Sequence, residues 1–410
     1  MERDIEVGME KYDSYKDSGV QWLGQIPSHW RAVRLKRICN MKSGDNLTSN
    51  DIADEGTYPV YGANGFRGYY HDYNKNGKFL LVGRQGALAG NVHRVDGMFW
   101  ATDHAVVTSI SPQQDMDYMF YALISMTLNQ YAFDTAAQPG LAVSKILLLS
   151  CPLPPLHEQQ AIVSYLDGKC GKIDQLLENK AKELELLAEM KQRVIADAVT
   201  KGLNPDATMK ESGIPWLPQI PEHWEASKVS THFRQRNEKV SDKDYPALSV
   251  SKQGITPQLE NVALSNAEGN SRRLVRIGDY AVNSRSDRKG SCGVSKYEGS
   301  VSLITIVLEP RNIYGGYVHF LFRSTPWVEE FYRNGRGIVA DLWTTNYQMM
   351  KGMYLPIPPI DEQKAIVAYI EDHVAKIDTL AQKLQQEIDS IKEYKQRLIL
   401  DVVTGQIKVC

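Results

Sequence analysis

Cysteine is scarce in this sequence, and the few cysteines stand far apart. They occur at positions 39, 151, 170, 292 and 410, with no Cys-x-x-Cys pair among them. This spacing argues against a disulfide framework or a structural zinc site and favours a reducing cytoplasm. The nine histidines include no His-x-x-x-His pair. His29 and His223, each followed by a tryptophan, are therefore predicted to be structural partners rather than metal ligands.

Long apolar runs are missing too. The apolar run at 146–149 is broken by Ser150 and Pro152 and is far too short to span a bilayer. The N-terminal residues MERDIEVGME are acidic, where a signal peptide requires a basic start and an apolar core. We therefore expect a soluble cytoplasmic protein.

Signatures of catalysis are also missing. The sequence has no GxxxxGK[ST] loop for nucleotide phosphates. An amino-methyltransferase would carry Asn or Asp before Pro-Pro, but Leu153 and Ile357 stand at these places. Glu362-Gln363-Lys364 resembles part of a nuclease site, yet the first copy reads Glu158-Gln159-Gln160 and lacks the lysine. We expect an exposed helix turn at both places. The sequence therefore predicts a binding protein that is not itself an enzyme.

The most prominent feature that is present is a duplication. Residues 152–200 match residues 356–404 at 22 of 49 positions, without a gap. Upstream, residues 18–30 match residues 212–224 at 9 of 13 positions. The 410 residues, 42% of them hydrophobic, are enough for two or more folded domains. We infer a tandem duplication with pseudo-two-fold symmetry, whose intervening segments show no comparable similarity.

Each downstream repeat predicts a long helix that follows a Pro-Pro pair. The helices are expected over about 172–200 and 376–404, after a short first helix and a bend near Gly168. Gly202 and Gly405 are expected to end them. Apolar residues recur at alternating spacings of four and three, which is typical of a coiled coil. The predicted seam residues are Ile173, Leu177, Leu184, Leu187 and Val194 in the first helix, and Ile377, Leu384, Ile388, Ile391 and Leu398 in the second.

Lys191 and Lys395 interrupt this seam at equivalent places. They could fix the register of the helices or contact a partner, or their charged ends could simply reach solvent. The segments 31–151 and 225–355 alternate β-rich runs with glycine turns, and the stretches 116–133 and 317–333 read as covering helices. Both segments are predicted to be α/β or α+β domains.

The formal net charge of −2 excludes a uniformly basic nucleic-acid coat. Positive charge is nevertheless concentrated in the second variable segment, with 18 basic and 13 acidic residues over 225–354. Arginine can read guanine, and Asn or Gln adenine, through paired hydrogen bonds. Such loops could equally be solvated surface. The candidate DNA contacts are Tyr61, Asn64, Arg67, Tyr69, Arg84, Gln85 and Arg94 in the first segment, and Arg272, Arg273, Arg276, Asn283, Arg285, Arg288 and Lys289 in the second.

The motifs SGVQWLGQIPSHW and LPPLHEQQAIV, followed by SGIPWLPQIPEHW and PPIDEQKAIV, resemble the specificity (S) subunit of type I restriction–modification enzymes, the HsdS family. The resemblance implies two target recognition domains, at 1–151 and 204–355, each reading one half of a bipartite DNA site through the major groove. The helical regions at 152–203 and 356–410 would form an antiparallel coiled coil. Because the two variable segments differ in sequence, the site should be asymmetric.

The resemblance also implies partners. The helices would space the two half-sites and dock two methyltransferase (M) subunits, and motor-nuclease (R) subunits would complete a restriction complex against phage DNA. S-adenosylmethionine would belong to the M subunits, and ATP and magnesium to the R subunits, leaving no cofactor on this chain. Two alternatives remain open: a coiled-coil scaffold that binds only proteins, and a self-contained modification enzyme that would have to bind S-adenosylmethionine without the expected motif.

Overall fold

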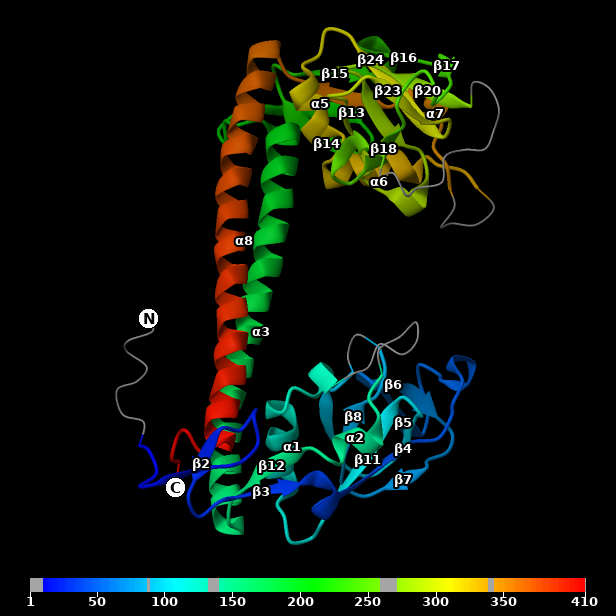
Figure 1. Ribbon diagram of the computed structural model, residues 1–410. Helices are drawn as coiled ribbons and strands as arrows, with labels where there is room; N and C mark the ends of the chain where they lie inside the picture. Colours follow the sequence, from blue (N-terminus) through cyan, green and yellow to red (C-terminus); the bar gives the residue numbers. More distant parts are fainter. Residues whose placement is uncertain (1–9, 87–88, 132–139, 259–270, 338–342, 410) are drawn as a thin grey trace. The chain divides into compact units, whose positions relative to one another are not determined.

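The computed structural model describes residues 10–86, 89–131, 140–258, 271–337 and 343–409. The chain forms two compact units, and each contains one globular part and a stretch of both long helices (Figure 1). Unit 1 comprises Met1–Ala181 and Gln386–Cys410, and unit 2 comprises Lys182–Gln385. The fold is therefore mixed α and β with two long helices, as predicted.

The globular part of unit 1 is built on an antiparallel sheet in the order β4-β11-β8-β9. Alternate residues of a strand point to opposite faces. Leu80 and Val82 accordingly pack toward helix α1, whereas Leu81 packs toward Phe99 of a second sheet, β6-β5-β10-β7. The elements are β1 (Tyr15–Asp17), β2 (Gln25–Pro27), β3 (Arg31–Arg34), η1 (Leu35–Arg37), β4 (Cys39–Ser43), η2 (Ser49–Asp51), β5 (Tyr58–Gly62), β6 (Gly65–Tyr70), β7 (Lys75–Asn76), β8 (Phe79–Gly83), β9 (Val92–Val95), β10 (Met98–Ala101), β11 (Ala105–Ile110), α1 (Met116–Ser125), η3 (Leu128–Tyr131), α2 (Val143–Ile146) and β12 (Ser150–Leu153).

Unit 2 repeats this plan with the sheet β16-β24-β21-β22. Tyr280 and Val282 pack toward Tyr317 of α5, and Ala281 packs toward Val301 of the sheet β17-β20-β23. The elements are β13 (Met209–Ile214), β14 (Leu217–Pro221), β15 (Glu225–Lys228), α4 (Val229–His232), β16 (Phe233–Gln235), β17 (Lys239–Val240), β18 (Leu248–Ser251), β19 (Gly254–Pro257), β20 (Arg272–Val275), β21 (Tyr280–Asn283), η4 (Ser286–Arg288), β22 (Cys292–Val294), β23 (Gly299–Ser302), β24 (Thr305–Pro310), α5 (Gly315–Leu321), α6 (Thr325–Arg333), α7 (Tyr347–Met350) and β25 (Tyr354–Ile357).

The duplication therefore extends into segments whose sequences differ. In unit 1, β8 pairs with β11 so that Gly83 faces Ala105, and in unit 2 β21 pairs with β24 so that Asn283 faces Thr305. The pairs Leu153↔Arg31 and Ile357↔Glu225 correspond in the same way, at the junction with the long helices. Backbone pairing is thus shared where side-chain identity is not.

The long helices are continuous, and the predicted bend near Gly168 is wrong. Helix α3 spans Leu156–Lys201 and α8 spans Ile360–Val403. A glycine costs a helix only about 1 kcal/mol relative to alanine, and buried Ile162, Leu166 and Cys170 hold the turns around it. The covering helix predicted over 317–333 is two helices, α5 and α6, because α6 starts afresh with a proline in its first turn.

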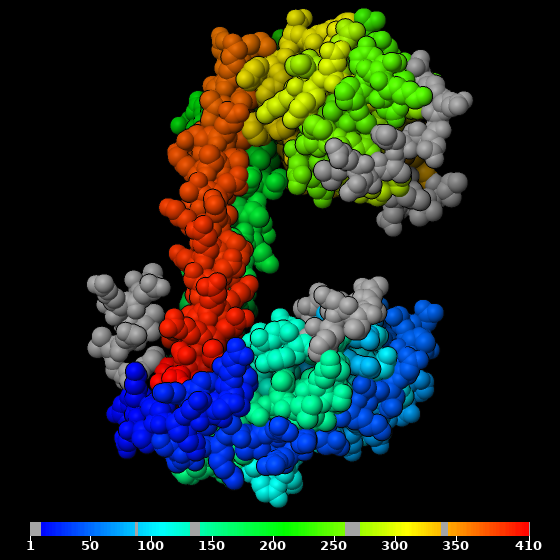
Figure 2. Space-filling view, in the orientation of Figure 1, coloured from blue at the N-terminus to red at the C-terminus, as the bar shows by residue number. Residues whose placement is uncertain are grey.

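In each unit a stretch of α3 packs antiparallel against a stretch of α8. In unit 1 Lys180 Nζ lies 2.6 Å from Glu387 Oε2, and Lys395 Nζ lies 2.6 Å from Asp174 Oδ1, so the chain directions are opposed. In unit 2 the side chains of α8 (orange) lie directly against those of α3 (green) in Figure 2. Every predicted seam residue is buried or half-buried, whereas the neighbouring helix positions are mostly exposed: Ile173, Leu177, Leu184, Leu187, Val194, Ile377, Leu384, Ile388, Ile391 and Leu398.

A repeated cluster joins each globular part to the helices. In unit 1 Trp30 Nε1 donates to Glu158 Oε2 at 2.9 Å, and His29 Nε2 lies 2.7 Å from Glu158 Oε1. In unit 2 Trp224 and His223 contact Glu362 at 3.1 and 2.7 Å. Glu158 is buried, so the predicted exposed turn is wrong. Its burial raises the pKa, but the hydrogen bonds from Trp30 and His29 outweigh this and hold the pKa below its usual value.

Each helix also ends on the cluster. Gly202 and Gly405 end α3 and α8, both with φ of +76°. A Cβ at Gly405 would lie 3.2 Å from Trp30, and one at Gly202 would lie 3.2 Å from Trp224. Glycine is thus required at both places by the backbone and by the close tryptophan. Across the described residues, no helix has both the length and the hydrophobicity needed to cross a membrane.

Candidate nucleic-acid interface

Several predicted DNA contacts lie in one loop of each unit, between β8 and β9 in unit 1 and between β21 and β22 in unit 2. Both loops close in the same way, because Gly83 N donates to Asn91 O at 2.8 Å and Asn283 N donates to Ser291 O at 2.9 Å. Both contain a glycine with positive φ just before closure, Gly90 at +94° and Gly290 at +74°. We call the described residues of these loops the recognition loops, 84–86 with 89–91 in unit 1 and 284–291 in unit 2.

A second segment holds each recognition loop. In unit 1 Leu141 N donates to Arg84 O at 2.8 Å, and Gln85 forms a β-bridge with Gly140. In unit 2 Thr345 N donates to Ser284 O at 2.9 Å, and Arg285 forms a bridge with Thr344. The first residues of each loop are therefore fixed by backbone bonds on top of the sheet ladder.

The unit 2 loop presents cations that are partly neutralised. Arg285 donates from Nε and Nη2 to the two oxygens of Asp287, at 2.9 and 3.0 Å. Arg288 is exposed, and its Nε lies 3.8 Å from Asp287 Oδ2. Arg285 and Arg288 thus keep N–H groups for an additional acceptor, since one guanidinium carries five donors.

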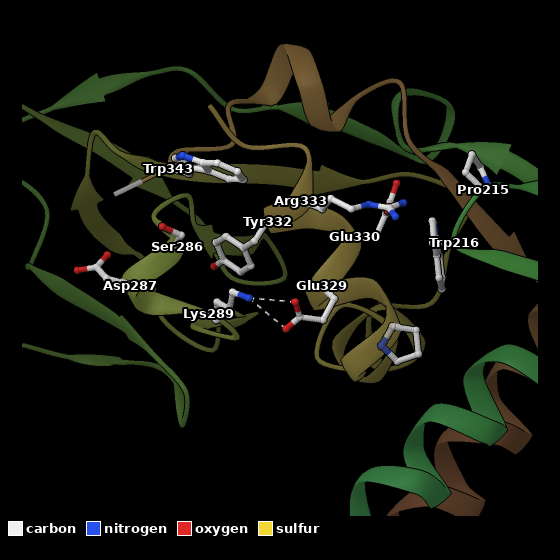
Figure 3. Close-up of a pocket in the computed structure, with 11 residues that line it drawn as sticks. Pro215, Trp216, Ser286, Asp287, Lys289, Glu329, Glu330, Tyr332, Arg333 and Trp343 are labelled. Atoms are coloured by element: carbon white, nitrogen blue, oxygen red, sulfur yellow. Dashed lines mark hydrogen bonds and ion pairs between the residues drawn. The ribbon is translucent and has the colours of Figure 1, made fainter. Parts of the chain in front are cut away.

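Lys289 belongs to a different environment. Its Nζ lies 3.0 Å from Glu329 Oε2, at a hollow of about 840 Å³ that Tyr332 and Trp343 also line (Figure 3). Asp287, Glu329 and Glu330 give this hollow more carboxylates than the cations Lys289 and Arg333 can balance. An acidic lining repels phosphate, so the hollow itself is a poor place for the DNA backbone.

In unit 1 the candidates come from the recognition loop and from the β5–β6 hairpin. Arg84 Nη1 donates to Ser43 Oγ at 3.3 Å. At the hairpin, Asn64 Oδ1 accepts from Asn91 Nδ2 of the recognition loop at 3.5 Å, which brings the two segments together. Arg67 is exposed, while Tyr61 and Tyr69 are half-buried against Phe66.

Three of the arginines predicted to contact DNA make contacts within the fold. Arg272 points inward from β20 and is 9% exposed, with its guanidinium donating to Ser300 Oγ and Ser300 O, each at 2.9 Å. Burial lowers its pKa. Arg273 is half-buried and donates to the carbonyl of Thr305. Arg272 is thus held within the fold, whereas Arg273 Nε is buried without a hydrogen-bond partner among the described residues. Contact of either residue with DNA stays a prediction.

Arg94 is the third. It stands on β9 with Nε 3.0 Å from Asp117 of α1 and Nη1 3.3 Å from Asp167 of α3. Its guanidinium carbon also lies 4.0 Å from the ring centre of Phe120. Arg94 therefore ties the sheet to two helices. Arg276 is exposed away from these bonds, and Asn283 Oδ1 accepts from Arg285 N at 3.1 Å, shaping the loop instead of pointing outward.

Sequence reasoning missed some side chains of this region. Arg336 is exposed and pairs through its backbone with Thr344, beside the bridge to Arg285. Phe66 is 54% exposed next to Arg67. The glycines that flank Arg336 were a usable signal for a loop, whereas its position beside residue 285 depends on tertiary pairing. In the described part of the chain, no group of His, Cys, Asp and Glu side chains could hold a metal ion.

Comparison with known proteins identifies relatives. Residues 27–186 match the family of the type I restriction modification DNA specificity domain. The chain is 39% identical over 162 residues to the type I restriction enzyme EcoprrI specificity subunit of Escherichia coli, a match that covers 38% of this chain and 40% of that protein. It thus spans about two-fifths of the length of that relative.

Two other similarities are longer. The chain is 23% identical over 438 residues to the EcoBI specificity subunit of Escherichia coli, covering 95% of this chain and 89% of that one. A chain from a solved structure concerned with complex assembly and conformational transition of the type I R-M system matches with a TM-score of 0.66 and 15% identity. That match covers 93% of this chain and 99% of the other, and it shows the fold.

Proposed function

From the similarity of residues 27–186 to the type I restriction modification DNA specificity domain, we propose that this chain is the DNA-recognition subunit of a type I restriction–modification complex and carries no catalytic site of its own. Each globular part would read one half of a bipartite site through the major groove of double-stranded DNA. The observation that carries this proposal is the pair of recognition loops. They share the backbone hydrogen bonds that anchor and close them but differ in side chains, as expected for two readers of unequal half-sites.

We further propose that the long helices dock two M subunits and set the gap between the half-sites. Leu176 on α3 and Leu380 on α8 occupy matching places in the repeat, off the seam, and are 44% and 54% exposed. A single exposed leucine is ordinary on a protein surface, but exposure at the same place in both copies is what two docking sites for one partner would require. Two equivalent surfaces suit two copies of one partner. S-adenosylmethionine would then lie on the M subunits, and ATP and magnesium on the R subunits that join them in the cytoplasm.

Methylation sequencing tests the function. DNA would be taken from cells that express this chain with the methyltransferase subunit encoded beside it. We expect a split, asymmetric motif that disappears when this chain is deleted. Replacing residues 31–151 by the corresponding segment of a relative should change one half of the motif and leave the other half intact.

A binding titration separates the main alternative. If the chain were a scaffold for proteins only, the purified complex would show no affinity for duplex DNA that falls as salt rises. Absence of both the motif and this affinity would refute the proposed function. A swap that altered both halves of the motif would refute the assignment of one globular part to each half.

A further inference from the structure

Residues 85 and 285 occupy the same place in the two units. In the strand pairs, Gly83 faces Ala105 and Asn283 faces Thr305. Residue 85 follows Gly83 by two positions, and residue 285 follows Asn283 by two positions. Both then form an isolated antiparallel bridge, Gln85 to Gly140 and Arg285 to Thr344. The equivalence of residues 85 and 285 thus rests on backbone pairing and not on similarity between the two loop sequences.

The backbone at this place is fixed equally in both units. The carbonyl of the preceding residue accepts a bond from the next strand segment, at 2.8 Å in unit 1 and 2.9 Å in unit 2. The loops close at the same register, because Asn91 O accepts from Gly83 N and Ser291 O accepts from Asn283 N, eight positions apart in each unit. A backbone held in this way is what a recognition position requires, because only a side chain on a fixed backbone can discriminate between bases.

The two side chains have the chemistry for different bases. A glutamine amide can donate and accept at once, which matches N6 and N7 of adenine. A guanidinium donates twice, which matches O6 and N7 of guanine. Asp287 holds Arg285 by its Nε and one Nη2 hydrogen, leaving three N–H groups in the same plane. The side chain of Arg285 is 42% exposed despite this contact.

We propose that residue 85 and residue 285 are matched specificity-determining positions: Gln85 reads an adenine in one half-site, and Arg285 reads a guanine in the other. This inference rests on the proposed function and adds the base class that each half contains. Asp287 is a positioning residue that orients the arginine. The basic neighbour Arg288, whose Nε lies 3.8 Å from Asp287 Oδ2, would instead contact phosphate.

The test exchanges the two side chains in the full complex. The variants are Gln85→Arg and Arg285→Gln, each expressed with the wild-type M subunit, and the methylated motif is determined by sequencing. We expect Gln85→Arg to change one adenine to guanine in one half only, and Arg285→Gln to change one guanine to adenine in the other half only. Each preference should shift by about tenfold or more at that base pair.

Matched controls separate base reading from charge. Gln113→Arg adds the same charge to unit 1 at an exposed glutamine away from the loop. Arg288→Gln removes a charge within the unit 2 loop. Both should leave the motif unchanged, and Arg288→Gln should weaken binding equally for all sequences, with a smaller dependence on salt. Binding of each purified complex to a randomised duplex library gives the preference even if a variant does not methylate.

The outcomes are distinct. If the wild type yields a split motif and the two exchanged variants select the same motif as the wild type, the inference is overturned while the proposed function stands. A variant that loses affinity equally for every sequence also overturns it, because its residue then contacts phosphate or holds the fold. If the wild type yields no motif and no salt-dependent affinity for duplex DNA, the proposed function fails first.

Discussion

The two units of this chain are copies in their framework and differ in their recognition loops. Trp30 and Trp224 make the same bond to a helix carboxylate, and Gly405 and Gly202 end the helices with the same φ. At the equivalent loop position, by contrast, one unit has Gln85 and the other Arg285. The comparison teaches that duplication preserved what holds each unit together, while the side chains that could select DNA diverged.

The strongest test of the shared framework removes its tryptophans. Trp30 and Trp224 are both fully buried, and replacing a buried tryptophan by alanine costs about 3–5 kcal/mol. We expect Trp30→Ala to destabilise unit 1 and Trp224→Ala to destabilise unit 2 by similar amounts, measured by hydrogen exchange of each unit during urea unfolding. Half-buried Trp100 provides a control, for which alanine should cost clearly less. Unequal losses from Trp30→Ala and Trp224→Ala would contradict equivalence.

Replacing the helix-terminal glycines should destabilise the two units by different amounts. Alanine at either site adopts the left-handed conformation at a cost of roughly 1–2 kcal/mol. A Cβ at Gly405 would also lie 2.4 Å from Pro27 Cδ, whereas at Gly202 the nearest atoms lie at 3.2 Å. Gly405→Ala should therefore cost about 1–3 kcal/mol more than Gly202→Ala. Gly97→Ala is the control for conformation alone, since its φ is +97° and its Cβ would meet nothing within 4 Å.

A third difference concerns pH. Tyr118 and Tyr317 make equivalent bonds to Pro152 O and Pro356 O, so Phe120 of unit 1 corresponds to His319 of unit 2. Burial, with the nearby cations Arg323 and Lys296, lowers the pKa of His319 from 6.5 to about 4. Between these two pKa values His319 is protonated in the unfolded chain but neutral in the folded unit. The free energy of unfolding of unit 2 therefore falls as the pH drops below 6.5.

Between pH 7 and 5 this histidine should cost unit 2 about 2 kcal/mol. His319→Phe, which installs the unit 1 residue, should remove that part of the slope. The pH dependence of unit 1 provides the control, because burial lowers the pKa of its own His93 and the substitution leaves this group untouched. Hydrogen exchange of α5 at several pH values measures the effect. An unchanged slope in the variant would show that His319 does not titrate against folding.

Much of the framework could be read from the sequence, because it depends on local spacing. The alternation of four and three places Ile377 and Leu384 on one helix face wherever the partner lies. The surroundings of other residues could not be read from the sequence, because they depend on pairing between distant segments. Successive residues of β20 face opposite sides of the sheet, and the strand pairing places Arg272 on the inner side. If β20 paired one residue out of register, Arg272 would point outward. Glu158 looked like an exposed turn because its partner Trp30 is far away in the sequence.

The smallest expected effect concerns the two lysines that interrupt the seam. Lys395 pairs with Asp174 in unit 1 at 2.6 Å, and Lys191 pairs with Asp378 in unit 2 at 2.7 Å. Each aspartate belongs to the repeated Lys-Ile-Asp sequence, so both pairs are copies of one contact. Ion pairs with one exposed partner contribute only about 0–1 kcal/mol. Their value would therefore lie in excluding misaligned helices, which would separate these charges.

Charge exchange distinguishes alignment from stability. Lys395→Asp alone places two carboxylates together and should destabilise unit 1 by up to about 1 kcal/mol at low salt. Adding Asp174→Lys should recover the loss, and the same cycle at Lys191 and Asp378 should give the same coupling in unit 2. In 1 M salt, where the screening length is about 3 Å, both couplings should shrink. If the exchanged pair recovered no stability in either unit, the apolar seam alone would set the register of the helices. The two lysines would then be side chains that only reach solvent and were copied with the repeat.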